Sequence, residues 1–179
     1  MNKEPDQAVK ILLTGKPGCG KTTVIMKLAG LLKALKVAGF YTEQIRSGGQ
    51  RTGFSVCTFR GAEGVLSSVN FRQGPQVGKY RVDVAGLEKI IAAEFDENRR
   101  DVDVYIIDEI GKMECYSNLF VRTVRNILRS NIPLVATVAL KGSGFIEEVK
   151  AHPGIELIEV IMANRDELPK KITARLSRL

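Results

Sequence analysis

Glycine, lysine and threonine residues near the start of the chain have the types and spacing that bind phosphate. The stretch Gly15-Lys16-Pro17-Gly18-Cys19-Gly20-Lys21-Thr22 follows the pattern G-x-x-x-x-G-K-[ST] between an apolar run and a helical pattern. Because glycines lack a Cβ, such a loop can turn its backbone N–H groups inward around an anion, and the following helix adds its positive end. Lys21 would reach the β- and γ-phosphates of a nucleotide, and the Thr22 hydroxyl would bind Mg²⁺. We therefore predict a phosphate-binding loop, in which Lys16 and Pro17 fill variable positions.

A pair of acids ends a second apolar run. The segment reads Val104, Tyr105, Ile106, Ile107, Asp108, Glu109, Ile110 and Gly111. An Asp at the end of a strand beside a phosphate-binding loop holds the Mg²⁺ shell, so we assign Asp108 to the metal. We assign Glu109 to orienting or deprotonating an attacking water. This pair favours hydrolysis by water, whereas transfer to an organic acceptor would need a second substrate pocket.

The cation that would neutralise transition-state charge is less defined. Lys112 lies close after the two acids and could lean over the γ-phosphate, or it could be an ordinary loop lysine. Arg46 and Arg51 flank a predicted hairpin turn and are the alternative source, although charged hairpin ends are usually solvated. We assign the role to Lys112 and keep the arginines as the alternative.

The elements that must position these residues alternate between strands and helices. Strands are predicted at residues 9–14, 102–108, 132–140 and 155–161. Helices are predicted at 22–36 and 85–100, after Ser117, near Ile146 and from Pro169. In the first helix one face would carry Val24, Leu28, Leu31, Leu32 and Leu35. In the helix after Ser117 the inward residues would be Phe120, Val124, Ile127 and Leu128.

Residues 39–69 depart from this alternation, because β-rich pieces split by glycine-containing turns predict a meander of hairpins. Residues 70–78 are predicted to be a loop. Strands separated by helices imply a mostly parallel sheet covered on both faces. We therefore expect an α/β fold of the P-loop class, with an inserted antiparallel hairpin region.

Length and composition limit the remaining possibilities. With 179 residues, the chain suits one domain over residues 1–179. The apolar runs are too short to span a membrane, and the first ten residues lack a signal-peptide core, so we expect a cytoplasmic protein without a membrane partner. Three separated cysteines support neither a disulfide framework nor a zinc site. A net charge of +7 suits a polyanionic partner such as a nucleotide or nucleic acid. We expect a monomer.

Several other polar residues carry two interpretations. Asn164, Arg165 and Asp166 follow the last predicted strand and either contact a nucleotide base or, for Asn164 and Asp166, cap the terminal helix. Arginines on the helix after Ser117 favour a solvated face over nucleic-acid binding, because no aromatic residues interleave with them. These arginines are Arg122, Arg125 and Arg129. His152 has no partner ligands in the sequence, and we give it no catalytic role.

Beyond the phosphate loop, four stretches resemble a known family. They are GFYTEQIRSGGQRTGF at 39–54, VGKYRVD at 77–83, DEIGKMECYS at 108–117 and NRDELP at 164–169. In this order they resemble the thermophilic nucleoside-triphosphatase family, also called cancer-related nucleoside triphosphatases. The resemblance covers nearly the whole chain, and only Cys115 departs slightly from the family's pattern.

This resemblance implies a small Mg²⁺-dependent enzyme of the added-strand, catalytic-glutamate branch of P-loop proteins. It would hydrolyse ATP, GTP and other nucleoside triphosphates to the diphosphate and phosphate with little base selectivity. Its nucleotide-binding segments would be residues 15–22 and 104–111. One alternative is a nucleoside or nucleotide kinase whose lid or acceptor site contains Arg72, Lys79 and Arg81. Another is an ATP-switched module that binds nucleic acid through a basic face.

Overall fold

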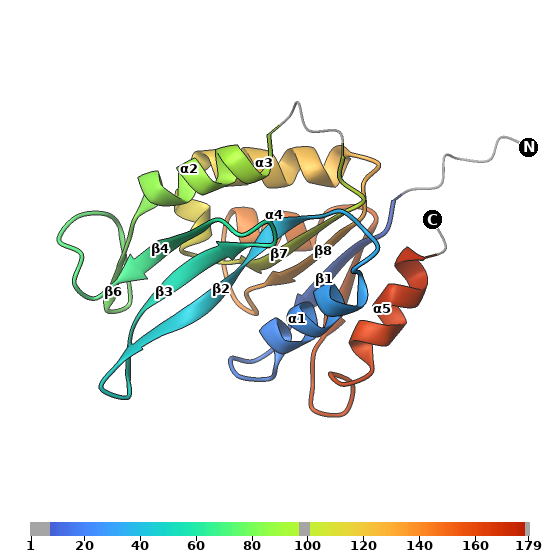
Figure 1. Cartoon of the computed structure of the whole chain (residues 1–179), viewed down its shortest axis with the longest axis horizontal. Helices are drawn as coiled ribbons and strands as arrows, with labels where there is room; N and C mark the ends of the chain where they lie inside the picture. The colour runs from blue at the N-terminus through green and yellow to red at the C-terminus, as the bar shows by residue number, and fades with distance from the viewer. Residues whose placement is uncertain (1–7, 97–100, 178–179) are drawn as a thin grey trace, which may run out of the picture.

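A nine-stranded mixed sheet runs through the described part of the chain, and helices cover both of its faces (Figure 1). The computed structural model describes residues 8–96 and 101–177. In space the strands are ordered β5-β6-β4-β3-β2-β7-β8-β1-β9. The elements in chain order are β1 Lys10–Thr14, α1 Lys21–Leu31, β2 Val37–Ser47, β3 Gln50–Thr58, β4 Glu63–Ser68, β5 Gln76–Val77, β6 Tyr80–Val82, α2 Val84–Glu94, β7 Val104–Ile110, the 3₁₀ helix η1 Glu114–Tyr116, α3 Asn118–Arg129, β8 Leu134–Val138, α4 Phe145–Lys150, β9 Ile155–Glu159 and α5 Leu168–Leu176.

The parallel strands are apolar on both faces because each face packs on its own layer of helices. Leu12 of β1 and Ile107 of β7 belong to the core that includes residues of α2 and α3. Their chain neighbours Ile11 and Ile106 belong to the second core, with residues of α1 and α5. Successive side chains of a strand point to opposite faces, so a doubly covered strand must be apolar throughout. This confirms the predicted α/β fold with helices on both faces.

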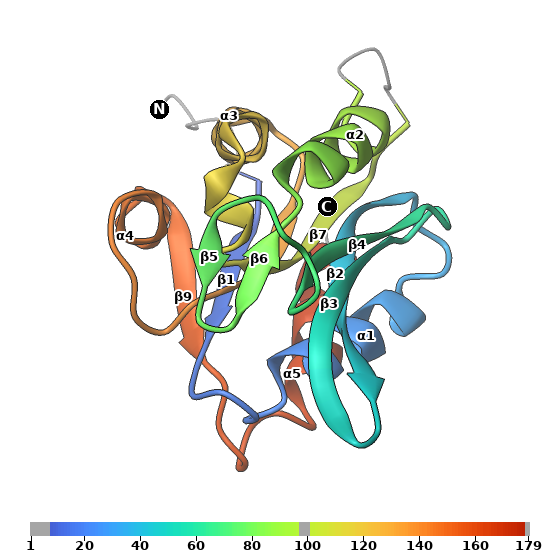
Figure 2. The same cartoon turned by 90° about the vertical axis from the view of Figure 1, so that its left-hand side faces the viewer.

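The strand pairing changes from parallel to antiparallel at β2. Strands β2, β7, β8, β1 and β9 run parallel to one another, whereas β3, β4, β6 and β5 are antiparallel to their neighbours. The predicted hairpin region is therefore confirmed over β2 to β4. The tip of the β2–β3 hairpin extends past the sheet toward the end where α1 begins (Figures 1 and 2). This extension brings the hairpin to the edge of the predicted phosphate site.

Three local predictions are wrong. The first helix ends at Leu31, and that side chain is 49% exposed rather than on the buried face. Residues 70–78 are not entirely loop, because Gln76–Val77 forms β5 and pairs with β6. The helix predicted at 85–100 ends at Glu94, and residues 97–100 lie outside the described part.

Helix α3 begins as predicted. The Ser117 hydroxyl accepts a hydrogen bond from the Phe120 N–H at 2.9 Å and donates one to Glu88 at 2.9 Å. The predicted inward residues Phe120, Val124, Ile127 and Leu128 are all buried. The cap therefore fixes the helix start and ties it to α2.

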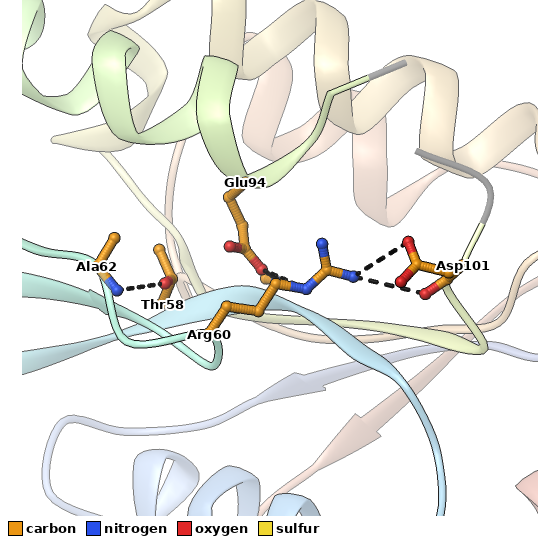
Figure 3. A network of polar contacts seen from close by, with 6 residues as sticks. Thr58, Arg60, Ala62, Glu94 and Asp101 are labelled. Atoms are coloured by element: carbon orange, nitrogen blue, oxygen red, sulfur yellow. Dashed lines mark hydrogen bonds and ion pairs between the residues drawn. The ribbon is translucent and has the colours of Figure 1, made fainter. Parts of the chain in front are cut away.

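A partly buried polar network lies around Arg60, between the hairpin region and the segment before β7 (Figure 3). Glu94, at the end of α2, accepts a hydrogen bond from the Gly39 N–H of β2 at 2.8 Å. Arg60, after β3, lies 3.9 Å from Glu94 and 3.9 Å from the Asp101 carboxylate. Burial raises the pKa of Glu94, and the Gly39 hydrogen bond and the charge of Arg60 offset part of the rise. The network ties the end of α2 to β2, to the turn after β3 and to the segment before β7.

In residues 8–96 and 101–177, no helix combines the length and apolarity needed to span a bilayer.

Candidate active site

The predicted phosphate-binding loop lies between β1 and α1 as expected. Gly20 has a φ of 104° just before the helix, a conformation that side chains with a Cβ rarely adopt. The Cys19 N–H donates to the Lys16 carbonyl at 3.2 Å and closes a turn within the loop. Lys21 donates to the Gly15 carbonyl at 3.1 Å, so its side chain folds back over the loop. The first turn of α1 has no acidic residue. The loop is therefore a concave, positively charged surface suited to an anion.

Asp108 lies in the last half of β7, lines the same cavity as this loop and is 1% exposed. One carboxylate oxygen accepts a hydrogen bond from the Thr137 hydroxyl at 2.5 Å. Burial raises the pKa of Asp108, while hydrogen bonds from Thr137 and Thr22 and the charge of Lys21 offset part of the rise. The other oxygen, Oδ2, is buried without a hydrogen-bond partner. A buried carboxylate oxygen without a partner is costly, so this position calls for a cation or a bound water.

The donor set here fits Mg²⁺. Asp108 and Thr22 supply a carboxylate and a hydroxyl, the hard oxygen ligands that Mg²⁺ prefers. Among the residues that the structure describes, no group of three or more His, Cys, Asp or Glu could hold a metal by itself. Such a sparse set matches the way Mg²⁺ binds in nucleotide sites, with water and substrate phosphates completing its shell.

Glu109 stands where two cavities meet. The first, which we call the phosphate cavity, has a volume of about 630 Å³ and is lined among others by Gly18, Lys21, Thr22, Gln44, Asp108 and Glu109. The second, which we call the outer cavity, also measures about 630 Å³, and Glu109 and Lys21 line it too. Burial raises the pKa of Glu109, Lys21 offsets part of this rise, and Asp108 adds to it. A carboxylate with a raised pKa is a better proton acceptor than an exposed one.

Glu114 is a third acid in this region, and the sequence interpretation gave it no role. It is 5% exposed on η1 and lines the outer cavity. Burial raises the pKa of Glu114 to about 8, and the charges of Glu109 and Asp108 add to the rise. A Cβ placed on Gly111 would lie 2.8 Å from a Glu109 carboxylate oxygen and 2.9 Å from a Glu114 oxygen, so the two acids flank Gly111. An acid inside the motif DEIGKMECYS was the available signal.

Of the cations that line the outer cavity, Lys112 and Arg51 are the two candidates for neutralising transition-state charge. Lys112 is exposed and lines it, and its role beside the γ-phosphate stays a prediction. Arg51 also lines it, and its Nε donates to the Tyr80 hydroxyl at 2.8 Å while the guanidinium lies 5.0 Å from the centre of the Phe54 ring. Arg46 instead bonds within the hairpin, to the Gly49 carbonyl and the Gln44 side chain. The structure thus separates the two hairpin arginines, which the sequence did not distinguish.

The other predicted nucleotide-binding residues divide into cavity walls and supports. Gly15 lines the outer cavity, and Pro17 lines both cavities. Lys16 is exposed, and Cys19 packs on the core beneath α1. The strand residues Val104, Ile106, Ile107 and Ile110 are fully buried, while Tyr105 and Gly111 lie on the same strand and just after it. These strand residues support Asp108 and Glu109 from the core.

The segment after β9 lies against the start of α1. A Cβ on Gly20 would be 3.3 Å from the Arg165 side chain, so this arginine borders the loop. Asp166 pairs with Lys27 of α1 at 2.9 Å. The Asn164 side chain bonds to the Ile161 N–H and the Glu159 carbonyl. The interpretation of Asn164 and Asp166 as caps of α5 is therefore wrong, because Asn164 closes a turn, Asp166 pairs with α1 and the helix begins without a side-chain cap.

The basic face of α3 is partly neutralised. Arg125 forms two hydrogen bonds to the Glu148 carboxylate, at 2.8 and 2.7 Å. Its guanidinium also lies 5.2 Å from the centre of the Phe145 ring. Of the three arginines on this face, only Arg122 and Arg129 remain for contacts with nucleic acid. The geometry therefore gives little support to the nucleic-acid-binding alternative.

The strand–loop–helix phosphate site and the acid at the end of a parallel strand define a P-loop α/β protein. A family model described as NTPase matches residues 10–173. Nucleoside-triphosphatase THEP1 of Thermotoga petrophila is 41% identical over 164 residues, which cover 92% of this chain and 90% of the relative. The cancer-related nucleoside-triphosphatase homolog of Bos taurus is 34% identical over 183 residues, which cover 93% of this chain and 95% of the relative.

Solved structures agree. The crystal structure of THEP1 from Aquifex aeolicus has a TM-score of 0.81 and 37% identity, covering 94% of this chain and 99% of that one. The solution structure of a human cancer-related nucleoside triphosphatase has a TM-score of 0.80 and 35% identity, covering 96% of this chain and 98% of that one. The chain belongs to the NTPase family of these nucleoside-triphosphatases, which confirms the resemblance found in the sequence.

Proposed function

We propose that the chain is a Mg²⁺-dependent nucleoside-triphosphate phosphohydrolase that converts a nucleoside triphosphate and water to the diphosphate and phosphate. The observation that carries the proposal is one cavity in which the phosphate-binding loop, Lys21, Asp108 and Glu109 converge. Membership of the NTPase family supports the same reaction.

The residues of the chain perform separate parts of this reaction. The loop N–H groups and Lys21 hold the β- and γ-phosphates. Glu109 accepts a proton from water as the water oxygen bonds to the γ-phosphorus and the bond to the bridging oxygen breaks. The diphosphate leaves with the electron pair of that bond. Asp108 and Thr22 would hold Mg²⁺, which when bound supplies charge neutralisation at the β- and γ-oxygens.

We propose broad base specificity on the same geometry. Arg165 is the charged side chain that borders the loop at Gly20, on the segment proposed to meet the base. An arginine can stack on any base, because every base has a π face. We further propose that residues 1–179 act as one domain, as a monomer and in the cytoplasm. The free state of Cys19, Cys57 and Cys115 is in keeping with a reducing compartment.

Phosphate release tests this proposal. We expect ATP, GTP, CTP and UTP each to yield phosphate with Mg²⁺, and EDTA to stop the release. Lys21→Ala should lower kcat by more than about a hundredfold while its circular dichroism stays that of the wild type. Near-normal hydrolysis by the folded Lys21→Ala variant, or equal rates with EDTA, would contradict the proposal. Size-exclusion chromatography with light scattering would check the monomer.

A further inference from the structure

The outer cavity is larger than a hydrolase site requires. A single attacking water occupies about 30 Å³, whereas ligand pockets commonly measure about 300–1,000 Å³. The outer cavity, with about 630 Å³, falls in the second range. Lys21, Gly15 and Glu109 line it, so it opens directly on the place predicted for the γ-phosphate. Because Glu109 is the proposed proton acceptor, a group that gives up its proton to Glu109 could occupy this cavity.

The walls of the outer cavity indicate what would fill it. Its apolar residues come from five separate parts of the chain and include Phe54, Leu66, Val77, Met113, Ala139 and Leu140. Such walls favour an apolar or aromatic body over a shell of water. Lys141, in the segment after β8, is an exposed cation that lines the same cavity, and Arg51 and Lys112 are two more. A ligand with an anionic group would satisfy this charge.

The residues that the kinase alternative relied on lie elsewhere. Arg81 bonds to the Gly74 carbonyl at 2.9 Å, and Lys79 lies over the Tyr80 ring at 5.5 Å. Arg72 lines a different cavity beside Phe71. The outer cavity is therefore lined by other residues than the three that the kinase alternative named.

We propose that the outer cavity binds a small organic alcohol with an apolar or aromatic body and an anionic group, and that the enzyme transfers the γ-phosphoryl group to its hydroxyl. In this reaction the hydroxyl oxygen bonds to the γ-phosphorus, and the bond from that phosphorus to the β–γ bridging oxygen breaks. Glu109 takes the hydroxyl proton, and the nucleoside diphosphate leaves with the electron pair. The products are the diphosphate and a phosphate monoester. This inference rests on the proposed nucleotide site, and hydrolysis is then the same step with water in place of the alcohol.

The test uses the full chain with Mg²⁺-ATP and defined probes. Hydroxymethylbenzoate and the larger hydroxymethylnaphthoate carry a hydroxyl, an aromatic body and a carboxylate, and methylnaphthoate lacks only the hydroxyl. Phosphorus NMR separates the phosphate monoester from inorganic phosphate. We expect monoester from the two alcohols, more from the naphthoate, and none from methylnaphthoate, which should inhibit monoester formation competitively.

Two matched substitutions locate the probe. Ala139→Phe would fill the outer cavity, so the ratio of monoester to inorganic phosphate should fall by about tenfold or more, equivalent to about 1.4 kcal/mol. Val65→Phe adds a similar ring at a side chain that is 44% exposed on β4, and the ratio should not change. An unchanged ratio in Ala139→Phe would overturn the assignment to this cavity.

The outcomes separate the two proposals. If ADP and inorganic phosphate are the only products with both alcohols, the acceptor site is refuted and the hydrolase stands. If ATP is not consumed with or without probe, the proposed function itself fails. If methylnaphthoate neither binds in a fluorescence titration nor inhibits monoester formation, the outer cavity is not a substrate site and the acceptor proposal is overturned.

Discussion

At the scale of single residues, Asp108 and Glu109 are neighbours with different surroundings. Asp108 is almost fully buried, one of its oxygens accepts a hydrogen bond from the Thr137 hydroxyl, and the other has no hydrogen-bond partner. Glu109 is less buried and borders both cavities. A fixed oxygen suits a metal, whereas a carboxylate at an open cavity suits proton transfer.

Substitutions should separate these roles. Glu109→Gln keeps the shape of the side chain, so Mg²⁺-ATP binding should persist while kcat falls by about 10²–10⁴-fold through loss of the base. Asp108→Asn should instead raise the Mg²⁺ concentration needed for half-maximal rate, because the metal loses a charged ligand. Calorimetric titration with a non-hydrolysable analogue beside steady-state rates measures both effects. Near wild-type turnover by Glu109→Gln would move the proton acceptor to another residue.

The pKa of Glu114 predicts a pH-dependent stability. With a folded-state pKa of about 8 against a usual value of 4.5, the folded protein holds a proton that the unfolded chain has lost. The contribution of Glu114 to the free energy of unfolding should therefore be largest below pH 4.5. It should fall as pH rises from there to about 8, by up to about 1.4 kcal/mol per pH unit. Urea unfolding of wild type and Glu114→Gln across this window isolates the effect. Parallel curves for the two proteins would contradict it.

At the scale of elements, the β2–β3 hairpin and the segment after β7 each bring one cation to the outer cavity. We expect Lys112→Ala to lower kcat by about tenfold or more with little change in KM, because charge on the γ-phosphoryl oxygens develops mainly in the transition state. Arg46→Ala is the control from the hairpin and should have no effect, since Arg46 bonds within its own turn. If Arg51→Ala lost activity and Lys112→Ala kept it, the hairpin would supply the cation.

The pairing of β2 with β7 requires a residue without a side chain at Gly39. A Cβ there would lie 1.8 Å from the Ile106 carbonyl oxygen of the neighbouring strand, and the φ is 133°. Gly39→Ala should therefore lower the free energy of unfolding by more than about 3 kcal/mol. Gly30→Ala in α1 is the matched control, because a Cβ there meets nothing within 4 Å. It should raise stability by about 0.5–1 kcal/mol. Equal effects of the two substitutions in thermal or urea unfolding would refute the close approach.

At the scale of the whole molecule, the phosphate cavity joins elements that are distant in the sequence. Residues of the loop before α1, of β2, of β3 and of β7 all line it. A nucleotide that contacts them together binds the folded state only, and it must therefore stabilise the entire fold.

The rise in the free energy of unfolding on nucleotide binding tests whether the nucleotide binds only the folded state. A non-hydrolysable Mg²⁺-ATP analogue at about a hundred times its Kd should add about 2.7 kcal/mol. For a chain of this length that raises Tm by about 5–10 °C. Removing Mg²⁺ with EDTA should reduce the shift in the wild type and change it little in Asp108→Asn. A full shift in Lys21→Ala would show that the analogue binds outside the phosphate cavity.

The sequence by itself determined the position of the glycine-rich loop between a strand and a helix, the acid pair after an apolar run, and the alternation of strands and helices; the metal and base roles of that pair stay predictions. These features depend on residue type at short spacing: glycines that permit a turn, a lysine at the start of a helix, acids directly after an apolar strand. The cap of α3 at Ser117 was predictable for the same reason, since a cap and its N–H partner are close in the chain.

The tertiary structure alone decided the features that depend on distant segments meeting. Glu114 became a buried acid because η1 packs beside Glu109 and the core, and only packing sets the burial that raises a pKa. Arg51, rather than Arg46, reaches the outer cavity because Tyr80 of β6 holds it there. The outer cavity itself is enclosed by residues of β3, β4, β5 and the segments after β7 and β8, whose proximity no local spacing encodes.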